Sequence, residues 1–267
     1  MADYTRNQIA ESLCAVGLRP GAVVYCHSNI GFFGTLEGVT RREELCEAIF
    51  DAVMTAIGPA GTLIVPTYTY SFSNGQSFDP GATASKMGLF AEWVRRHPDS
   101  LRSVDPCFSV AAIGPLAQEL CTGLPPNSFA PDSTFGRFLA LDGTLLNLNH
   151  PGCTLLHHVE RELRVPYRFD KAFEGELVTG GHSERRRWEI FVRYLSDPLL
   201  AHDPWPFIEA MARAGLSHRQ ALGRGEVLTM SARNVFATVE QGLSGTAWFL
   251  TAACRAGRTP HLDVSCR

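Results

Sequence analysis

Along most of the chain, segments with hydrophobic residues at helical spacing alternate with short, continuous hydrophobic runs. Behind Thr5, the residues Ile9, Leu13 and Val16 recur at helical spacing, and the helix is expected to end near Gly17. Short apolar runs typical of buried strands follow at residues 22–27, 62–65, 109–113 and 144–149. Helical spacing occupies residues 40–58, 87–97, 116–121 and 133–141, the first behind a capping box expected at residues 40–43. Such alternation predicts an α/β fold with a central, largely parallel mixed sheet flanked by helices.

The pattern changes between about residues 167 and 195. Residues 176–179 and 188–194 read as strands on either side of Gly180 and Gly181, which predicts an additional antiparallel hairpin after residue 165. Helical spacing returns over 204–214 and 231–243, and the last dozen residues are expected to form a loose tail. No internal repeat or linker is apparent. Residues 1–267 are therefore expected to form a single domain, with the hairpin subregion at about 167–200.

Composition narrows the functional classes. The 267 residues are 45% hydrophobic and 19% charged, with a net charge of −3 and a pI near 6.3. No overall positive field favours nucleic acid, and no apolar run approaches the roughly 20 residues that a membrane helix needs. The N-terminus lacks a signal-peptide core, and the eight cysteines have no CxxC spacing. We therefore expect a cytoplasmic protein with reduced thiols that binds neither nucleic acid nor membranes.

The segment from Thr154 to Glu160 holds the most informative chemistry. It follows a predicted buried strand and a turn, so Thr154 is expected to cap a helix that places His157 in its first turn. Glu160 lies three residues later on the same helical face, where it can orient the imidazole and stabilise the imidazolium. The pair is suited to act as a general base, although histidine and glutamate at this spacing also occur as surface pairs without a catalytic role.

The same segment also contains residues that could form a cysteine nucleophile or a zinc site. Cys153 could act as a nucleophile in a two-step route, although buried cysteine is usually inert packing. His150, His157, His158 and Glu160 include zinc-ligand types, but the adjacent histidines point to different helix faces and no i, i+4 histidine pair is present. No metal is therefore expected.

Several motifs occur together in the order and spacing of one family. The sequence resembles the aminoglycoside 3-N-acetyltransferases over roughly residues 20–245. The matching segments are His27-Ser28 with the loop to Gly34, residues 58–67, Phe78-Asp79-Pro80, Met87-Gly88, Arg102-Ser103 with Pro106, residues 109–114, residues 133–139, Thr154-Leu155-Leu156-His157 with Glu160, and Val165-Pro166-Tyr167.

The resemblance implies acyl transfer from acetyl-CoA, or a related acyl-CoA, to an amine, with His157 as the base and Glu160 as its partner. It also places CoA along the loop after the first strand and near the segment from Arg102 to Val110. The expected co-substrate residues are His27, Ser28, Asn29, Ile30, Gly31, Phe32, Gly34, Arg102, Ser103, Ser109 and Val110. Tyr68, Asp79 and Thr154 are expected on the acceptor side. Loop glycines and their N–H groups suit phosphate, and an arginine adds charge, although a plain turn and a surface ion pair explain the same residues.

Departures from the family pattern bear on the acceptor. The turn at residues 147–153 has no carboxylate where aminoglycoside-acetylating members often carry an aspartate, and Asp105 stands where a histidine is common. Residues 161–193 hold eight basic and six acidic side chains. A polycationic drug needs many carboxylates nearby, so we expect a less cationic, biosynthetic amine as acceptor. The alternatives are an aminoglycoside acceptor with a role in antibiotic resistance, or a relative that hydrolyses or transfers another acyl group, or only binds CoA. A homodimer is also possible.

Overall fold

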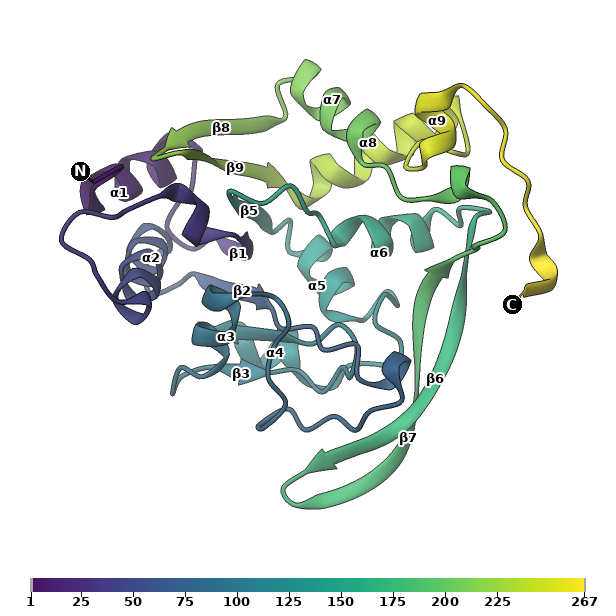
Figure 1. Ribbon diagram of the computed structural model, residues 1–267, viewed down its shortest axis with the longest axis horizontal. Helices are drawn as coiled ribbons and strands as arrows, with labels where there is room; N and C mark the ends of the chain where they lie inside the picture. Colours follow the sequence, from purple (N-terminus) through teal and green to yellow (C-terminus); the bar gives the residue numbers. More distant parts are fainter. Residues whose placement is uncertain (1, 267) are drawn as a thin grey trace.

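The computed structural model describes residues 2–266 and is built around one seven-stranded mixed sheet, in the strand order β3-β4-β2-β1-β5-β9-β8 (Figure 1). The strands are β1 (Val23–Ser28), β2 (Thr62–Pro66), β3 (Leu101–Arg102), β4 (Val110–Ile113), β5 (Thr144–Leu148), β8 (Ser217–Leu222) and β9 (Gly225–Ser231). β1 pairs in parallel with β2 and with β5, whereas the four outer pairings are antiparallel. The expected α/β fold with a mixed sheet is confirmed, but the sheet is not largely parallel as predicted, because β4, β3, β9 and β8 are added on either side of the parallel centre by antiparallel pairing.

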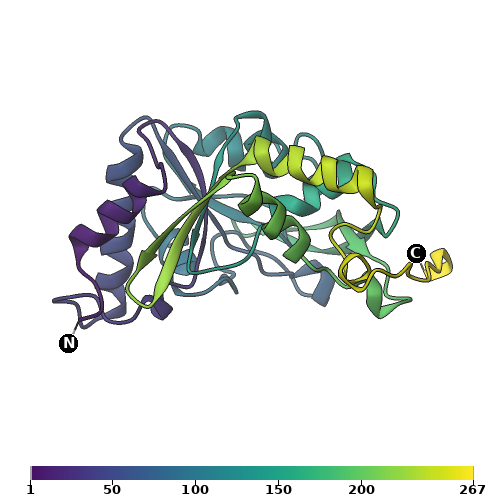
Figure 2. The same cartoon turned by 90° about the horizontal axis from the view of Figure 1, so that it is seen from above.

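Helices cover both faces of this sheet. The helices are α1 (Arg6–Ala15), α2 (Arg42–Ile57), α3 (Leu89–Arg95), α4 (Ala117–Cys121), α5 (Thr134–Ala140), α6 (Leu155–Glu162), α7 (Trp205–Arg213), α8 (Ala232–Gly245) and α9 (Ala252–Ala256). Successive side chains of a strand point to opposite faces. Val24 accordingly packs with α1, α2 and α3, while its neighbour Tyr25 packs with α4 to α8 on the other face. Two apolar cores therefore sandwich the sheet, and α1 and α2 lie at the opposite end of the molecule from α7 and α8 (Figure 2).

The predicted hairpin is a long two-stranded ribbon. β6 (Arg168–Thr179) and β7 (His182–Arg193) pair along their whole length and meet at Gly180 and Gly181, both of which have positive φ. The ribbon runs from the end of α6 past the β2–β4 side of the molecule (Figure 1). A small apolar cluster that includes Phe78, Trp188 and Ile190 fixes it to the main body. Its base, next to α6, is the part that contributes to the site described below.

Some local expectations were wrong. The capping box of α2 is formed by Arg41 and Glu44, not by residues 40 and 43, because the helix begins one residue later. The hairpin of β8 and β9 was not predicted, since four of the six β8 residues are exposed and the strand reads as polar. α9, which was not predicted, comes just before the expected C-terminal tail, and residues 257–266 hold one short turn, η4 (Val264–Cys266). Among the described residues, no helix is both long enough and apolar enough to span a bilayer.

Candidate active site

The predicted histidine–glutamate pair forms at the start of α6. β5 ends at Leu148, the chain turns, and α6 then presents His157 on its first turn. His157 Nδ1 lies 2.9 Å from Glu160 Oε2, across one helical turn. The side chain of His157 is 23% exposed, whereas that of Glu160 is completely buried. The pair therefore presents an imidazole at a surface and keeps its carboxylate away from water.

Glu160 has two further partners that follow directly after α6. Tyr167 donates its hydroxyl to Oε1 at 2.9 Å, and Arg168 Nε forms an ion pair with Oε2 at 2.9 Å. Burial alone would raise the pKa of Glu160, but the Arg168 charge and the His157 hydrogen bond outweigh burial and lower it to about 2. The carboxylate is therefore ionised and held in place. Tyr167 belongs to a predicted motif, but nothing in the sequence pointed to Arg168 as its neighbour.

The same surroundings keep His157 neutral. Burial and the charge of Arg168 lower the pKa of His157 below 6.5, and the hydrogen bond to Glu160 only partly offsets them. With Nδ1–H donated to the carboxylate, the lone pair of Nε2 is left to accept a proton. A neutral, oriented imidazole of this kind is what general base catalysis needs near pH 7.

His157 lines a cavity of about 540 Å³ at the base of the ribbon. Its basic and imidazole side chains are His157, Arg168, Lys171, Arg193 and His202, and its other walls are Phe108, Phe169, Phe173, Ile190, Phe191, Val192, Tyr194 and Leu195. His202 precedes α7, and its ring centroid lies 5.5 Å from that of His157, edge to face. Sequence reasoning missed this second imidazole because 45 residues separate it from His157 and it belongs to none of the matching motifs.

A second cavity, of about 450 Å³, is lined in part by Thr154. It brings together five of the predicted site residues, His27, Ser28, Asn29, Tyr68 and Thr154, and its remaining walls are Pro66, Tyr70, Lys86, Met87, Gly88, His150 and Gly152. Phe108 separates the two cavities. Its ring lines the first, and it contacts the rings of Tyr68 and Tyr70, which line the second. Phe108 thus links the wall of the cavity that includes His157 to the aromatic side chains of the second cavity.

Thr154 has a different contact from the one predicted. Its side chain does not cap α6; instead its hydroxyl lies 3.1 Å from His27 Nε2. The ring of His27 is buried, and burial together with the neighbouring His150 lowers its pKa to about 3. The expectation of a side-chain cap was wrong because the hydroxyl turns toward β1 rather than along the helix.

The rest of the loop after β1 is only partly in place to meet a ligand. Ile30 is buried, while Gly31 and Phe32 lie in the exposed turn η1 (Ile30–Phe33), and none of the three lines the second cavity. Gly34 has a φ of +92°, and a Cβ there would lie 2.3 Å from the Asp3 carboxylate. The glycine is therefore explained by the close approach of the N-terminal segment and not by a ligand.

The segment from Arg102 to Val110 is largely internal, and Phe108 is its one residue that lines either cavity, so its place beside CoA stays a prediction. Ser103, Ser109 and Val110 are completely buried. Arg102 lies over the ring of Phe78, and its guanidinium donates to the backbone oxygens of Pro80, Thr83 and Thr67 and to the hydroxyls of Thr67 and Ser109. Most of its N–H groups therefore already have protein acceptors. The segment connects β3 to β4 and is hydrogen-bonded to the loop after β2. Its polar groups therefore have partners within the protein.

This geometry predicts that Arg102 supports stability rather than co-substrate binding. Arg102→Met is expected to lower the free energy of unfolding by about 3 kcal/mol or more, because several buried carbonyls lose their donor. The Kd for acetyl-CoA, measured by calorimetry at a temperature where the variant is folded, should change less than threefold. A loss of CoA affinity without a loss of stability would instead show that Arg102 contributes to co-substrate binding.

Asp79 and Asp105 both organise turns. The carboxylate of Asp79 accepts from the N–H groups of Gly81 and Ala82, and Asp79 lines neither cavity, so its predicted contact with the acceptor is not supported. Asp105 is buried and accepts from the N–H groups of Cys107 and Phe108 at 2.8 Å. It thereby fixes the turn that presents Phe108 between the two cavities.

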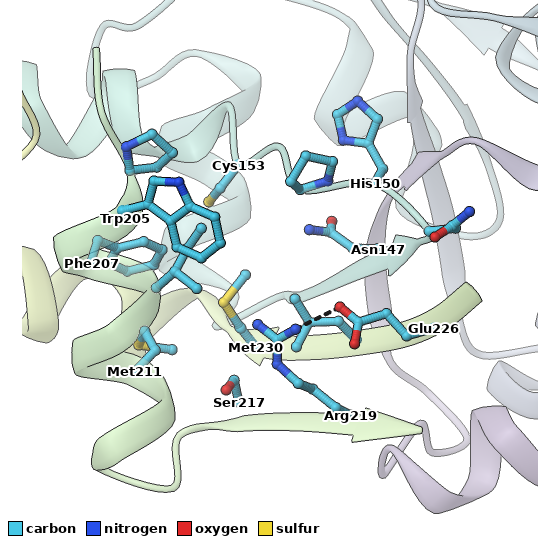
Figure 3. Close-up of a pocket in the computed structure, with 15 residues that line it drawn as sticks. Asn147, His150, Cys153, Trp205, Phe207, Met211, Ser217, Arg219, Glu226 and Met230 are labelled. Carbon is cyan, nitrogen blue, oxygen red and sulfur yellow. Dashed lines mark hydrogen bonds and ion pairs between the residues drawn. The ribbon is translucent and has the colours of Figure 1, made fainter. Parts of the chain in front are cut away.

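Cys153 lies apart from His157. It lines a third cavity of about 260 Å³ between α7 and the β9–β8 hairpin, among Trp205, Phe207, Met211 and Met230 (Figure 3). Burial raises the pKa of its thiol to about 12. The thiol is therefore protonated at neutral pH, and the structure does not support it as a nucleophile. In the part of the chain that the structure describes, no three His, Cys, Asp or Glu side chains are grouped as they would be around a metal ion.

Known proteins of one family are similar to this chain. The family model for aminoglycoside 3-N-acetyltransferase matches residues 26–244. Aminoglycoside N(3)-acetyltransferase IV from Salmonella sp is 31% identical over 226 residues, covering 79% of this chain and 82% of the relative. The chain belongs to the aminoglycoside 3-N-acetyltransferase family. Aminoglycoside N(3)-acetyltransferase IX from Micromonospora chalcea is 29% identical and covers 70% of this chain and 71% of its own length.

Solved structures of the aminoglycoside 3-N-acetyltransferases share the fold. The AAC-IIIb complex with CoASH superposes with a TM-score of 0.77 at 22% identity, covering 90% of this chain and 96% of that one. AAC-VIa bound to sisomicin gives a TM-score of 0.78 at 21% identity, covering 91% and 98%. Together with the family assignment, this makes the protein an acyl-CoA-dependent N-acyltransferase whose co-substrate is acetyl-CoA.

Proposed function

We propose that the protein transfers the acetyl group of acetyl-CoA directly to a primary amine of an aminoglycoside, with His157 as general base and Glu160 as its orienting partner. The observation that carries the proposal is the buried Glu160 carboxylate holding a neutral His157 at the wall of a 540 Å³ cavity. The relatives at 25–31% identity are named for acetylation of aminoglycosides. They favour this acceptor, and a role in antibiotic resistance, over the biosynthetic amine expected from the sequence.

We assign one cavity to each substrate. The cavity lined by Ser28, Asn29 and Lys86 suits the pantetheine and phosphates of CoA, since it offers polar groups and a cation. The cavity lined by His157 and His202 takes the amine. The nitrogen then attacks the thioester carbon, His157 Nε2 removes a proton from the nitrogen, and the C–S bond breaks with its electrons moving to sulfur. The CoA thiolate leaves, and His157 returns the proton to it directly or through solvent, which restores the neutral imidazole.

One observation favours a second candidate acceptor, an amine that is less cationic than an aminoglycoside. The lining of the amine cavity includes Arg168, Lys171 and Arg193 but no aspartate or glutamate. Arg168 is neutralised by Glu160, whereas within residues 2–266 neither Lys171 nor Arg193 forms an ion pair. Ammonium groups placed against such a lining would be repelled rather than stabilised.

An acceptor panel distinguishes the candidates. Thiol release from acetyl-CoA is measured with kanamycin, gentamicin, glucosamine and glucosamine 6-phosphate, for the wild type and for His157→Ala. Release that depends on kanamycin or gentamicin and is lost in the variant supports aminoglycoside acetylation. A kcat/KM at least tenfold higher for the sugar phosphate supports the second candidate. Amine-independent release would indicate a hydrolase, and CoA binding without release would indicate a binding protein, and either result would overturn the proposal.

A further inference from the structure

The wall of the amine cavity contains a second imidazole that has no role in the proposed reaction so far. His202 lines the same cavity as His157, with ring centroids 5.5 Å apart and an interplanar angle of 66°. Neither ring nitrogen of His202 forms a hydrogen bond with residues 2–266. An imidazole with free nitrogens at the wall of an acceptor cavity is available to a ligand.

The backbone around His202 is fixed from both sides. Ala252 donates its N–H to the Ala201 oxygen at 2.9 Å, Asp203 donates its N–H to the Leu250 oxygen at 2.9 Å, and His202 forms an isolated antiparallel bridge with Thr251. Backbone contacts with residues 250–252 thus fix the position of His202 at the wall of the cavity. Precise presentation of this kind is typical of groups that contact a substrate.

Several titratable groups face His202, which is itself an exposed residue at the rim of the cavity. From α6 these are His157 and Glu160, from β6 Arg168, and from its own segment Asp203. Lys171 and Arg193 of the ribbon line the same cavity. Desolvation by its neighbours, together with repulsion from Arg168 and from His157 when that ring is protonated, outweighs the two carboxylates and lowers the pKa of His202. A neutral imidazole accepts a hydrogen bond through one of its nitrogens.

A primary amine matches two such acceptors. It has one lone pair and two N–H groups, and two acceptors about 2.9 Å from its nitrogen lie roughly 5 Å apart. Two imidazole rings 5.5 Å apart at an angle to each other can offer nitrogens at that separation. With both N–H groups bound, the remaining lone pair has a single direction, toward the thioester carbon.

We propose that His202 accepts the second N–H of the acceptor's primary amine while His157 accepts the first, so that the pair selects primary amines and aims their lone pair. This inference rests on the proposed acetyl transfer. The nitrogen becomes positive as it bonds to carbon, so the hydrogen bond to His202 strengthens in the transition state and acts on kcat. No proton moves to His202; the proton that is removed goes to His157.

The test compares a primary amine with its N-methyl counterpart, glucosamine and N-methylglucosamine at saturating acetyl-CoA, with kanamycin as a further primary acceptor. The wild type should prefer the primary amine at least tenfold. His202→Ala should lower kcat for primary amines by roughly 10- to 100-fold, the effect of one hydrogen bond to a group that gains charge. It should leave N-methylglucosamine unchanged or faster, because the secondary amine has only one N–H and the methyl group gains room. The preference for the primary amine is then lost.

Two controls separate this role from simple packing. His202→Gln retains an acceptor oxygen and should recover part of the rate for primary amines, and His218→Ala, an exposed histidine on β8, should have no effect. Equal losses for primary and secondary amines would show that His202 only packs against His157 and would overturn the inference. Histidine ¹⁵N NMR of the protein with kanamycin alone gives an independent result: without a shift of a His202 nitrogen that depends on the amine, the inference fails. Loss of all amine-dependent activity in the wild type would instead reject the proposed function.

Discussion

Replacement of His157 by alanine is expected to lower kcat for amine acetylation by roughly 10²–10⁴-fold, the usual contribution of a positioned general base. The loss should appear in kcat, because the base acts on the proton that leaves during attack and not on the binding of either substrate. Thiol release with saturating acetyl-CoA and acceptor measures it. The Kd for CoA, measured by calorimetry, should stay within about threefold of the wild type, since the CoA cavity does not include His157.

The pH dependence of the wild type supplies a second measurement on the same residue. Because the pKa of His157 is lowered, the imidazole is neutral above that pKa, and kcat at saturating acceptor should fall only below pH 6.5 as the base becomes protonated. We use kcat because kcat/KM also follows the protonation of the free acceptor amine. His182→Ala, at the far tip of the ribbon, serves as a matched control and should keep full activity and the same profile. An active His157→Ala enzyme with an unchanged profile would remove His157 from the mechanism.

Replacement of Glu160 by glutamine is expected to reduce both stability and activity. Glutamine preserves the shape of the side chain but leaves Arg168, whose side chain is 7% exposed, without its counter-ion. Loss of one partner of a buried ion pair costs about 3–5 kcal/mol, and we expect a decrease of this size in the free energy of unfolding at pH 7. The kcat should also fall by about tenfold or more, because a neutral amide stabilises the imidazolium less than a carboxylate does.

The sign of the pH dependence makes this prediction specific. The pKa of Glu160 is lowered to about 2 from an ordinary value near 4.5, so the carboxylate contributes its stability above pH 4.5 and loses it as the pH falls toward 2. The stabilities of wild type and variant should therefore converge between pH 4.5 and 2. Urea unfolding at several pH values measures this, with Glu162→Gln on the exposed side of α6 as the control. A constant difference down to pH 2 would contradict the assigned charge on Glu160.

The central features of the fold could be predicted because they depend on local patterns. Buried strands such as β1, β2 and β5 read as apolar runs, and a glycine pair marked the turn of the ribbon. His157 and Glu160 were found for the same reason, since one helical turn fixes their contact. β8 could not be found in this way, because its exposed face removes the apolar signal.

The rest of the site depends on contacts between distant segments. His202 reaches His157 only through the anchoring of its loop by the C-terminal segment, and no spacing in the sequence encodes that pairing. Arg102 shows the converse case. Arginine beside serine resembles a phosphate site in sequence, but the carbonyls that satisfy the guanidinium come from the loop after β2 and the turn near Pro80. The acceptors of a charged group become visible only in three dimensions.

The residues proposed for proton transfer and most of the residues that line the cavity around the acceptor come from different elements. The base and its carboxylate belong to α6, whereas Lys171, Arg193 and much of the apolar wall facing them belong to an element outside the seven-stranded sheet. Arg168, the counter-ion of Glu160, is the first residue of β6 and joins the two parts. With Arg168 kept, substitutions farther along the base of the ribbon can change the charge and width of this cavity while the contacts of His157 and Glu160 stay in place. A homologous scaffold could therefore acquire a new acceptor by changes in the ribbon beyond Arg168.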